Sequence, residues 1–166
     1  MPFSGAGRVW DALLQSGERF GIRAFGVEAQ RLLRLEKGHA IIGQDTDNLT
    51  NPFEAKLGWA VRMGKPFFVG QRSLRILEKR GARQTLAGFE LPADHAPVLE
   101  ANLLIQDGEI AGRVTSIAHS PTLGRSIGLA MVAPHLAAPG SEIRIRSSDG
   151  RMVPARVVRT PFVEAA

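Results

Sequence analysis

The sequence predicts an α+β fold in which N-terminal helices with a long ordered loop precede a C-terminal antiparallel β-barrel of jelly-roll-like character. Apolar residues of the first half recur at helical spacing between glycines. The second half consists of short β-rich segments, several of which alternate apolar and polar residues, and Asp-Gly pairs mark tight hairpins. We therefore expect a helical domain over residues 1–83 and a barrel domain over residues 84–166.

Three helices are predicted in the first half. The first carries an i, i+3, i+4 apolar stripe made of Val9, Trp10, Leu13 and Leu14, and Gly17 lies near its end. The second runs from about residue 27 to residue 37, with Ala29, Leu32, Leu33 and Leu35 facing inward and Gly38 as its C-terminal stop. The third runs from near residue 70 to residue 81. The connection over residues 39–69 is long, and connections of that length inside a domain are usually functional.

Six strands are predicted in the second half. They correspond to the segments TLAGFEL, NLLIQ, EIAGRVTSI, RSIGLAMV, SEIRIRS and MVPARVVRT. Asp107-Gly108 and Asp149-Gly150 are two-residue hairpin signals. Ile143 and Ile145 alternate with charged residues, as a half-buried strand requires. Six short strands joined by such turns suggest a small antiparallel barrel or a jelly-roll-like sandwich.

Composition excludes several classes of protein. The 166 residues are 44% hydrophobic and 22% charged, which supports a packed core and argues against disorder. The absence of cysteine excludes disulfides, thiolate catalysis and cysteine-ligated metal centres. No apolar run approaches the roughly 18 residues that a membrane span needs, and the N-terminus does not have the pattern of a signal peptide. We expect a cytoplasmic protein without a membrane partner.

The net charge of +5 arises in the first half, where residues 1–83 hold 14 Lys and Arg against 8 Asp and Glu. The basic residues are scattered and often stand beside acids, which is typical of a solvated helix face. Alternatively, the positive field attracts an acidic ligand or partner. No motif for reading nucleic acid is present, so we expect no nucleic-acid partner.

The polar residues do not form a self-contained active site. The four histidines, His39, His95, His119 and His135, are isolated from one another and from carboxylates at metal-ligand spacing, so no metal site is predicted. Asp45 and Asp47 lie in a polar loop and are interpreted as turn-forming residues. Their segment DTDN resembles half a calcium loop, but the glycine and the distal glutamate of such a loop are missing.

The order of five unusual segments resembles the C-terminal half of the glycine-cleavage T-protein family, the tetrahydrofolate-dependent aminomethyltransferases. The segments are VWDALLQSGERFGIRAFGVEAQRLLRLEKG (9–38), IIGQDTDNLTNPFEAKLGWAV (41–61), FVGQRSL (68–74), GRVTSIAHSPTLGRSIGLAMV (112–132) and VVRTPF (157–162). Three stretches, EKG, IIGQDTD and LGRSIGLA, are similar to the C-terminal region of the sarcosine oxidase alpha subunit and to dimethylglycine oxidase. The resemblance covers nearly the whole chain.

The resemblance implies a function and an organisation. Residues 1–83 would be the helical part of an incomplete folate-binding region, and residues 84–166 the aminomethyltransferase C-terminal barrel. The chain would be a C-terminal part or subunit of a tetrahydrofolate-dependent aminomethyltransferase or sarcosine-oxidase-type enzyme that handles one-carbon units from N-methyl amino acids. The alternative is a non-catalytic interaction or structural module of the same fold. The related folate-binding proteins of iron–sulfur assembly are excluded, because they carry a cysteine and a tyrosine and this chain has neither.

The resemblance also implies which residues meet folate. The helix end and the loop after it line the folate cavity in the family, which assigns Arg34, Glu36, Gly43 and Trp59 here. Gln30 stands where T-proteins usually have a folate-contacting arginine, and His39 where they often have a tyrosine. The family's catalytic aspartate belongs to the N-terminal half, so no catalytic residue is assigned. We expect the isolated chain not to transfer one-carbon units, and to associate with itself or with a chain that supplies the N-terminal domains.

Overall fold

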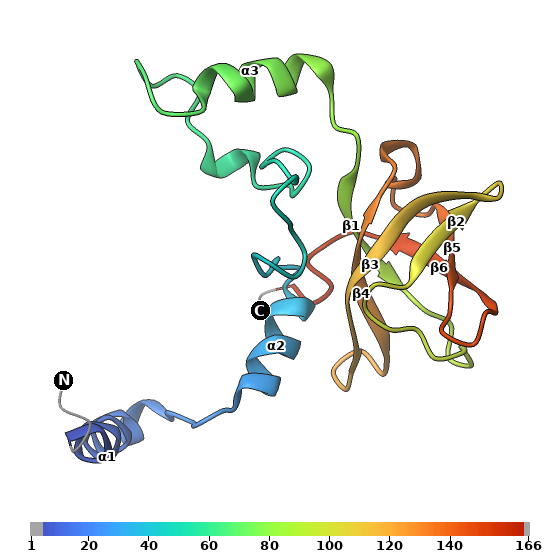
Figure 1. Ribbon diagram of the computed structural model, residues 1–166. Helices are drawn as coiled ribbons and strands as arrows, with labels where there is room; N and C mark the ends of the chain where they lie inside the picture. Colours follow the sequence, from blue (N-terminus) through green and yellow to red (C-terminus); the bar gives the residue numbers. More distant parts are fainter. Residues whose placement is uncertain (1–4, 165–166) are drawn as a thin grey trace. The chain divides into compact units, whose positions relative to one another are not determined.

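The computed structural model describes residues 5–164 and divides the chain into two compact units (Figure 1). The first unit ends at Arg31 and the second begins at Leu32. Helix α1 (Ala6–Gly17) and a 3-10 turn (Glu18–Phe20) belong to the first unit. Helix α2 (Val27–Glu36) crosses the boundary. The second unit adds a 3-10 turn (Gly58–Ala60), helix α3 (Gln71–Arg80) and all the strands.

The three predicted helices are confirmed, and glycine ends the second as expected. The N–H of His39 donates to the carbonyl of Arg34, and the N–H of Gly38 donates to that of Leu35, both at 2.8 Å. This pattern is a Schellman motif, which requires a left-handed residue, and Gly38 has φ +67°. A Cβ at this position would also lie 2.7 Å from the Cβ of Thr160. Glycine is therefore needed here for both its conformation and its size.

The expected inward face of α2 is only partly correct. Leu35 is buried and Leu32 is half-buried, but Leu33 is 54% exposed and Ala29 is also exposed. Helical periodicity identifies an apolar stripe, but it does not show how much of that stripe finds a partner within the same chain. Only the last turn of α2 is buried in the second unit.

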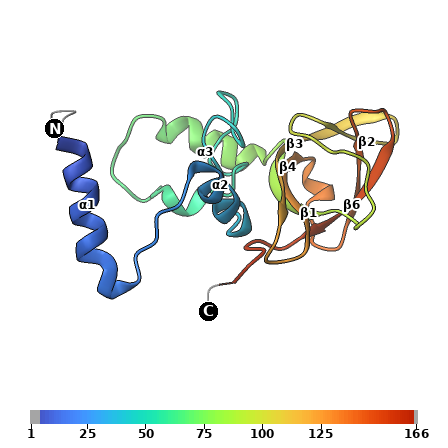
Figure 2. The same cartoon turned by 90° about the horizontal axis from the view of Figure 1, so that it is seen from below.

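The second half forms a closed antiparallel barrel of six strands, which confirms the predicted fold class. The strands are β1 (Thr85–Glu90), β2 (Leu103–Gln106), β3 (Glu109–Ser120), β4 (Arg125–Val132), β5 (Glu142–Arg146) and β6 (Met152–Val158). Their order round the barrel is β1-β4-β3-β2-β5-β6, and β6 pairs with β1 to close it (Figure 2). A short 3-10 turn (Pro134–Leu136) separates β4 from β5. The predicted domain boundary between residues 83 and 84 stays a prediction.

The turn between β2 and β3 confirms the first hairpin signal. Asp107 has φ +52° and Gly108 has φ +84°, so both central residues are left-handed, as a type I′ turn requires. In the second signal, Gly150 has φ +85° and its N–H donates to the carbonyl of Ser147 at 2.9 Å. Both Asp-Gly pairs therefore lie between adjacent antiparallel strands, but the second belongs to a five-residue connection (147–151), so the two-residue hairpin predicted there is wrong.

The barrel has an inner and an outer core, which follow from alternation along its strands. The inner core is apolar and includes Phe89, Leu104, Val114, Ile143, Ile145, Val153 and Val157. The outer core joins Leu35 of α2 to Leu86 of β1 and to three alternate residues of β4, which are Ile127, Leu129 and Met131. Burial of such side chains contributes about 1.5–3 kcal/mol each. The end of α2 is thus fixed on the outside of the barrel, over β1 and β4.

Among the helices described in residues 5–164, none is both long and apolar enough to cross a bilayer.

Candidate functional site

A cavity of about 580 Å³ lies where the end of α2, the long loop and the outer face of the barrel meet. Its floor is apolar and comes from strands β1 and β4, through Leu86, Gly88 and Leu129. Its walls come from two loop segments and the C-terminal tail, namely Gly38 to Ala40, Ala55 to Leu57, Trp59 and Thr160. Volume and lining are typical of a small-molecule site.

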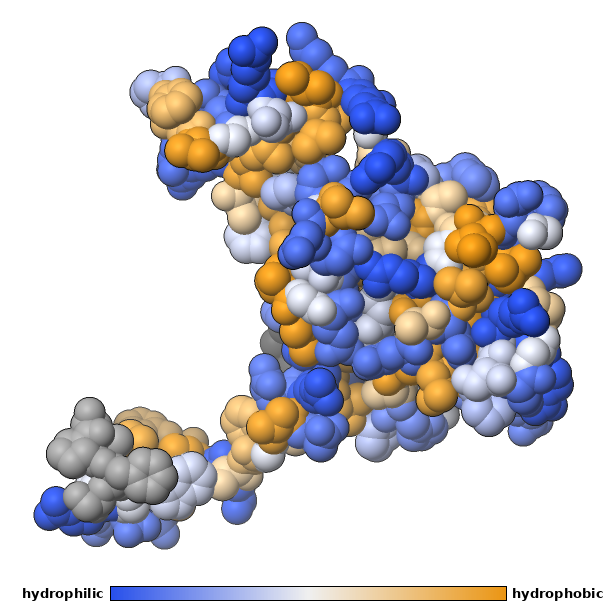
Figure 3. Space-filling view, viewed as in Figure 1, coloured by the Kyte–Doolittle hydropathy of each residue, from blue (hydrophilic) through white to orange (hydrophobic). Residues whose placement is uncertain are grey.

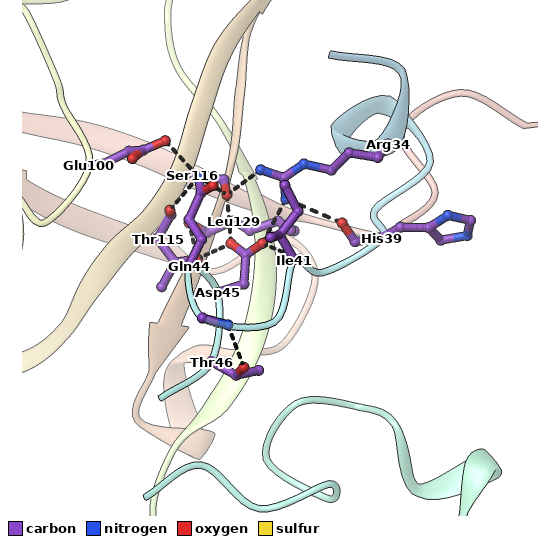
Figure 4. Close-up of polar contacts among 11 residues, drawn as sticks. Arg34, His39, Ile41, Gln44, Asp45, Thr46, Glu100, Thr115, Ser116 and Leu129 are labelled. Carbon is purple, nitrogen blue, oxygen red and sulfur yellow. Dashed lines mark hydrogen bonds and ion pairs between the residues drawn. The ribbon is translucent and has the colours of Figure 1, made fainter. Parts of the chain in front are cut away.

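The loop that forms one wall is attached to the barrel by a buried ion pair (Figure 4). Arg34 of α2 donates from Nη1 to Asp45 Oδ2 at 2.6 Å and from Nη2 to Ser116 Oγ of β3 at 2.8 Å. Its Nη1 also reaches the carbonyl of His39 at 3.2 Å. The side chain of Asp45 is 0% exposed and that of Arg34 is 10% exposed. One guanidinium thus connects the helix, the loop and the barrel.

The Asp45 carboxylate is satisfied on both oxygens. Oδ2 also accepts the backbone N–H of Ile41 at 2.8 Å. Oδ1 accepts the hydroxyls of Thr115 and Ser116, each at 2.6 Å. A buried charge is tolerated only when such partners replace water, and charge-assisted hydrogen bonds are the strong ones. The hydrogen bonding of Arg34 is less complete, since its buried Nε has no partner among the residues described.

A β-bulge in β3 makes this double contact possible. In a regular strand, consecutive side chains point to opposite faces. The pairing of β3 with β4 shifts between Val114 and Ser116, so that Thr115 is the extra residue. Both hydroxyls therefore reach the same carboxylate oxygen. Bulges commonly re-aim side chains in this way, and this one turns the barrel wall into a binding site for Asp45.

Glu36 is fixed nearby by a second buried contact. Its carboxylate accepts the hydroxyl of Ser120, at the end of β3, at 2.6 Å. Its backbone carbonyl accepts the N–H groups of Phe162 and Val163 at 2.9 and 3.0 Å. Glu36 is 5% exposed. This residue joins α2 to the barrel and to the C-terminal tail, and it does not line the cavity.

A third buried acid shapes the opposite wall. Glu54 is 1% exposed and accepts the backbone N–H groups of Asn51 and Arg83 at 3.1 and 3.2 Å. Its own N–H donates to the side-chain oxygen of Asn51 at 3.1 Å, so residues 51–54 form a compact turn. The turn leads into Lys56, which has φ +57°. This conformation costs a non-glycine residue about 1–2 kcal/mol.

Lys56 is the charged group of the cavity lining. Lys56 is exposed, but the protein around its ammonium group desolvates it and lowers its pKa, because desolvation penalises the charged form. No acid of residues 5–164 forms a salt bridge with it. The cavity lining from that same range contains no carboxylate. The described part of the cavity therefore combines one cation with an indole, an imidazole and an apolar floor.

The sequence-based site residues divide into three groups. His39 and Trp59 line the cavity, and Trp59 is 82% exposed. Arg34 and Glu36 lie behind the wall and hold it through buried contacts. Gly43 is exposed in the loop with φ +92°, and Gln30 is exposed in the first unit. Figure 4 shows the imidazole of His39 pointing away from the polar network. A contact of any of these residues with folate stays a prediction.

The interpretation of the two aspartates as turn formers is correct for one of them. Asp47 accepts the N–H groups of Leu49 and Thr50 at 2.9 Å each. These contacts and the hydroxyl of Thr50 lower the pKa of Asp47, with the hydroxyl as the largest cause. Asp45 is instead the buried partner of Arg34. The interpretation failed because two of the partners that bury Asp45, the hydroxyls of Thr115 and Ser116, lie about 70 residues away along the chain.

Two further roles were missed at the sequence level. Gln44 donates to the carbonyl of Thr115 at 3.2 Å and to the exposed Glu100 at 2.6 Å, which adds a polar rim to the network. The second is the role of Lys56 in the cavity lining. The sequence gives no signal for it, because its left-handed backbone is visible only in the structure. Among residues 5–164, no group of three metal-ligating side chains comes together.

Comparison with known proteins agrees with this architecture. Residues 84–164 match the glycine cleavage T-protein C-terminal barrel domain, and residues 1–65 match the GCVT N-terminal domain. The crystal structure of glycine cleavage system aminomethyltransferase T from Bartonella henselae superposes with a TM-score of 0.85 at 26% identity, over 99% of this chain and 45% of that one. A closed barrel that carries such a helical and loop region is thus a known class of fold.

The chain belongs to the glycine cleavage T-protein family. An aminomethyltransferase of Halothermothrix orenii is 37% identical over 155 residues, which are 93% of this chain and 43% of the relative. One of Bacteroides thetaiotaomicron is 38% identical over 156 residues, with the same coverage of both chains. The chain therefore spans less than half the length of these relatives.

The first prediction concerns the buried ion pair. Replacing Asp45 by Asn leaves the guanidinium of Arg34 buried without its counter-charge. We expect the free energy of unfolding to fall by about 3–5 kcal/mol, measured by urea titration with circular dichroism. Asp47→Asn is the matched control, because that carboxylate lies in the same loop and pairs with Arg113 at a partly exposed site.

The control should lose less than about 1 kcal/mol, since exposed ion pairs contribute little and an Asn side chain can still accept the turn hydrogen bonds. Equal stability of the two variants would show that the Arg34–Asp45 pair does not hold the loop.

Proposed function

We propose that the chain forms the C-terminal part of a tetrahydrofolate-dependent aminomethyltransferase-type enzyme and provides one wall of its folate cavity. The observation that carries the proposal is the cavity itself, which His39 and Trp59 line. The family resemblance assigns both residues to the surroundings of folate. An indole and an imidazole offer flat faces to a ring system, and ring stacking contributes about 0.5–1.5 kcal/mol beyond burial.

In this proposal the chain binds and positions, and another region supplies the reacting acid. Transfer of a one-carbon unit from an aminomethyl donor needs correct placement of the two reactants and a carboxylate placed to assist attack on the iminium. The described lining holds no carboxylate. Arg34 and Glu36 contribute indirectly, because their buried contacts set the position of the wall.

The finer specificity is also a proposal. Sarcosine-oxidase-type chemistry, in which one-carbon units come from N-methyl amino acids, rests on the stretches IIGQDTD (41–47) and LGRSIGLA (123–130). A cytoplasmic location belongs to the same proposal. In vitro, sarcosine or dimethylglycine as the source of the one-carbon unit would distinguish this specificity from that of a glycine-cleavage enzyme.

The folate proposal is tested with 5-formyltetrahydrofolate and a chimera in which this chain replaces the matching part of the Halothermothrix orenii relative. Calorimetry should show binding to the chimera, and Trp59→Ala should weaken it roughly tenfold through lost stacking. Phe67→Ala is the control, because Phe67 is equally exposed but lies outside the cavity lining.

A folded chimera that does not bind the compound, or that binds it equally well with Trp59→Ala, would contradict a folate cavity here. A non-catalytic module would become the better interpretation. If the 166-residue chain formed methylenetetrahydrofolate unaided, the expectation that another region supplies the acid would be wrong.

We further propose that the helical half is covered by a chain that supplies the N-terminal domains of the family, or by a second copy of this chain. Large apolar side chains are exposed in each unit: Trp10, Leu13, Phe20, Phe25 and Val27 in the first, and Leu33, Ile42, Leu49, Trp59, Phe67, Val69 and Ile76 in the second. Figure 3 shows apolar surface over α3 and the segment before it. Patches of this kind usually mark interfaces.

Sedimentation velocity at low micromolar concentration tests this association. We expect self-associated species for the chain alone, or a stable complex when a chain carrying the N-terminal domains is added. A monodisperse, thermally stable monomer that binds no such chain would contradict the proposal.

A further inference from the structure

Lys56 is an unexpected group at the cavity. Its backbone is left-handed, with φ +57°. Glycine adopts that conformation without strain, but a residue with a side chain such as lysine does not. Strained residues concentrate at functional sites, where surrounding structure holds them in place. Here the turn formed by Asn51 and the buried Glu54 holds the chain on one side. On the other side, the N–H of Leu57 donates to the carbonyl of Pro52 at 2.7 Å.

The charge of Lys56 has no partner within the described range of the chain. Neither a salt bridge nor a side-chain hydrogen bond engages its ammonium group among residues 5–164. The buried acids Glu36, Asp45 and Glu54 are each satisfied by other donors. Desolvation disfavours the charged form of such an ammonium group, and an anion placed beside it would stabilise that form.

The residues around Lys56 indicate what kind of group lies next to the anionic group of the ligand. Trp59 lies three residues further along and offers an exposed indole to the same cavity. Leu86 and Leu129 give an apolar floor, and the described lining adds no negative charge that would repel an acid. A ligand with a flat ring and a carboxylate complements both features at once.

We propose that Lys56 is the anion-recognition residue of this cavity and that it binds the carboxylate of an aromatic acid whose ring lies against Trp59. This inference rests on the proposed function, because it concerns the same cavity. For folate, the group in question is the benzoylglutamate end of the molecule. The charged tail would then be held by the C-terminal half, and the pterin ring by residues outside this chain.

The experiment uses two small probes and one reporter. Trp10→Phe leaves Trp59 as the sole tryptophan, because the chain has two. Its indole N–H then gives a single NMR signal that reports on the cavity. The probes are N-(4-aminobenzoyl)-L-glutamate, which is an aromatic acid, and 4-aminobenzamide, which has a similar ring but no charge.

We expect the acid to shift the Trp59 signal with a lower dissociation constant than the amide. Lys56→Gln and Lys56→Gly should each raise the dissociation constant of the acid by roughly tenfold or more, as the loss of a charged hydrogen bond predicts. Neither should change that of the amide. Lys56→Arg should preserve binding of the acid, and Lys65→Gln, in the same loop but outside the cavity lining, should have no effect.

Lys56→Gly separates recognition from structure, since glycine relieves the left-handed strain while removing the charge. This variant should melt no lower than the parent and still bind the acid more weakly. The inference is overturned if the acid leaves the Trp59 signal unchanged, if acid and amide bind equally, or if the Lys56 variants bind the acid as the parent does.

The two proposals can fail separately. Binding of the acid through Lys56 together with no binding of 5-formyltetrahydrofolate to the chimera would overturn the folate function and support this inference. Folate binding that depends on Trp59 but not on Lys56 would support the folate function and overturn this inference.

Discussion

The carboxylate of Asp45 is the contact on which the arrangement of this molecule depends. It lies fully buried, and its donors come from three elements: Arg34 of α2, Ile41 of the loop, and Thr115 with Ser116 of the sequence-distant strand β3. An unpaired charge in this place would be strongly destabilising. Because every donor must be present to satisfy it, the carboxylate specifies one position of the loop on the barrel.

The cavity follows from that position. Residues 38–40, which include the Schellman turn, line its wall, and the carbonyl of His39 is itself a partner of Arg34. The opposite wall depends in a similar way on Glu54, which fixes the turn before Lys56. Buried acids thus build both walls, while the exposed side chains at the mouth, Trp59 and Lys56, are left available for a ligand. Arg34 and Glu36 therefore belong to a functional region without lining its cavity, because they position the wall through buried contacts.

Much of the fold could be predicted because its signals are local. Gly17, Gly38 and Gly81 end apolar stripes of helical period, and Asp107-Gly108 fits only a narrow set of turns.

The site could be predicted only in part. Asp45 stands beside Asp47 in a polar loop, and nothing nearby distinguishes the buried acid from the turn former. The role of Asp45 depends on a bulge in β3 that shifts the register by one residue, and the sequence of the strand does not indicate that shift. The strain at Lys56 has no sequence signal either.

Amide hydrogen exchange at Ile41 tests the central claim most directly, because this N–H donates to Asp45 at 2.8 Å. In Asp45→Asn, under conditions in which the barrel stays folded, the account predicts that protection is lost at Ile41 and along residues 38–46. Protection in the ladder between β5 and β6, which lies outside the network, should be unchanged. If Ile41 stayed as protected as in the parent chain, the buried carboxylate would not be what holds the cavity wall in place.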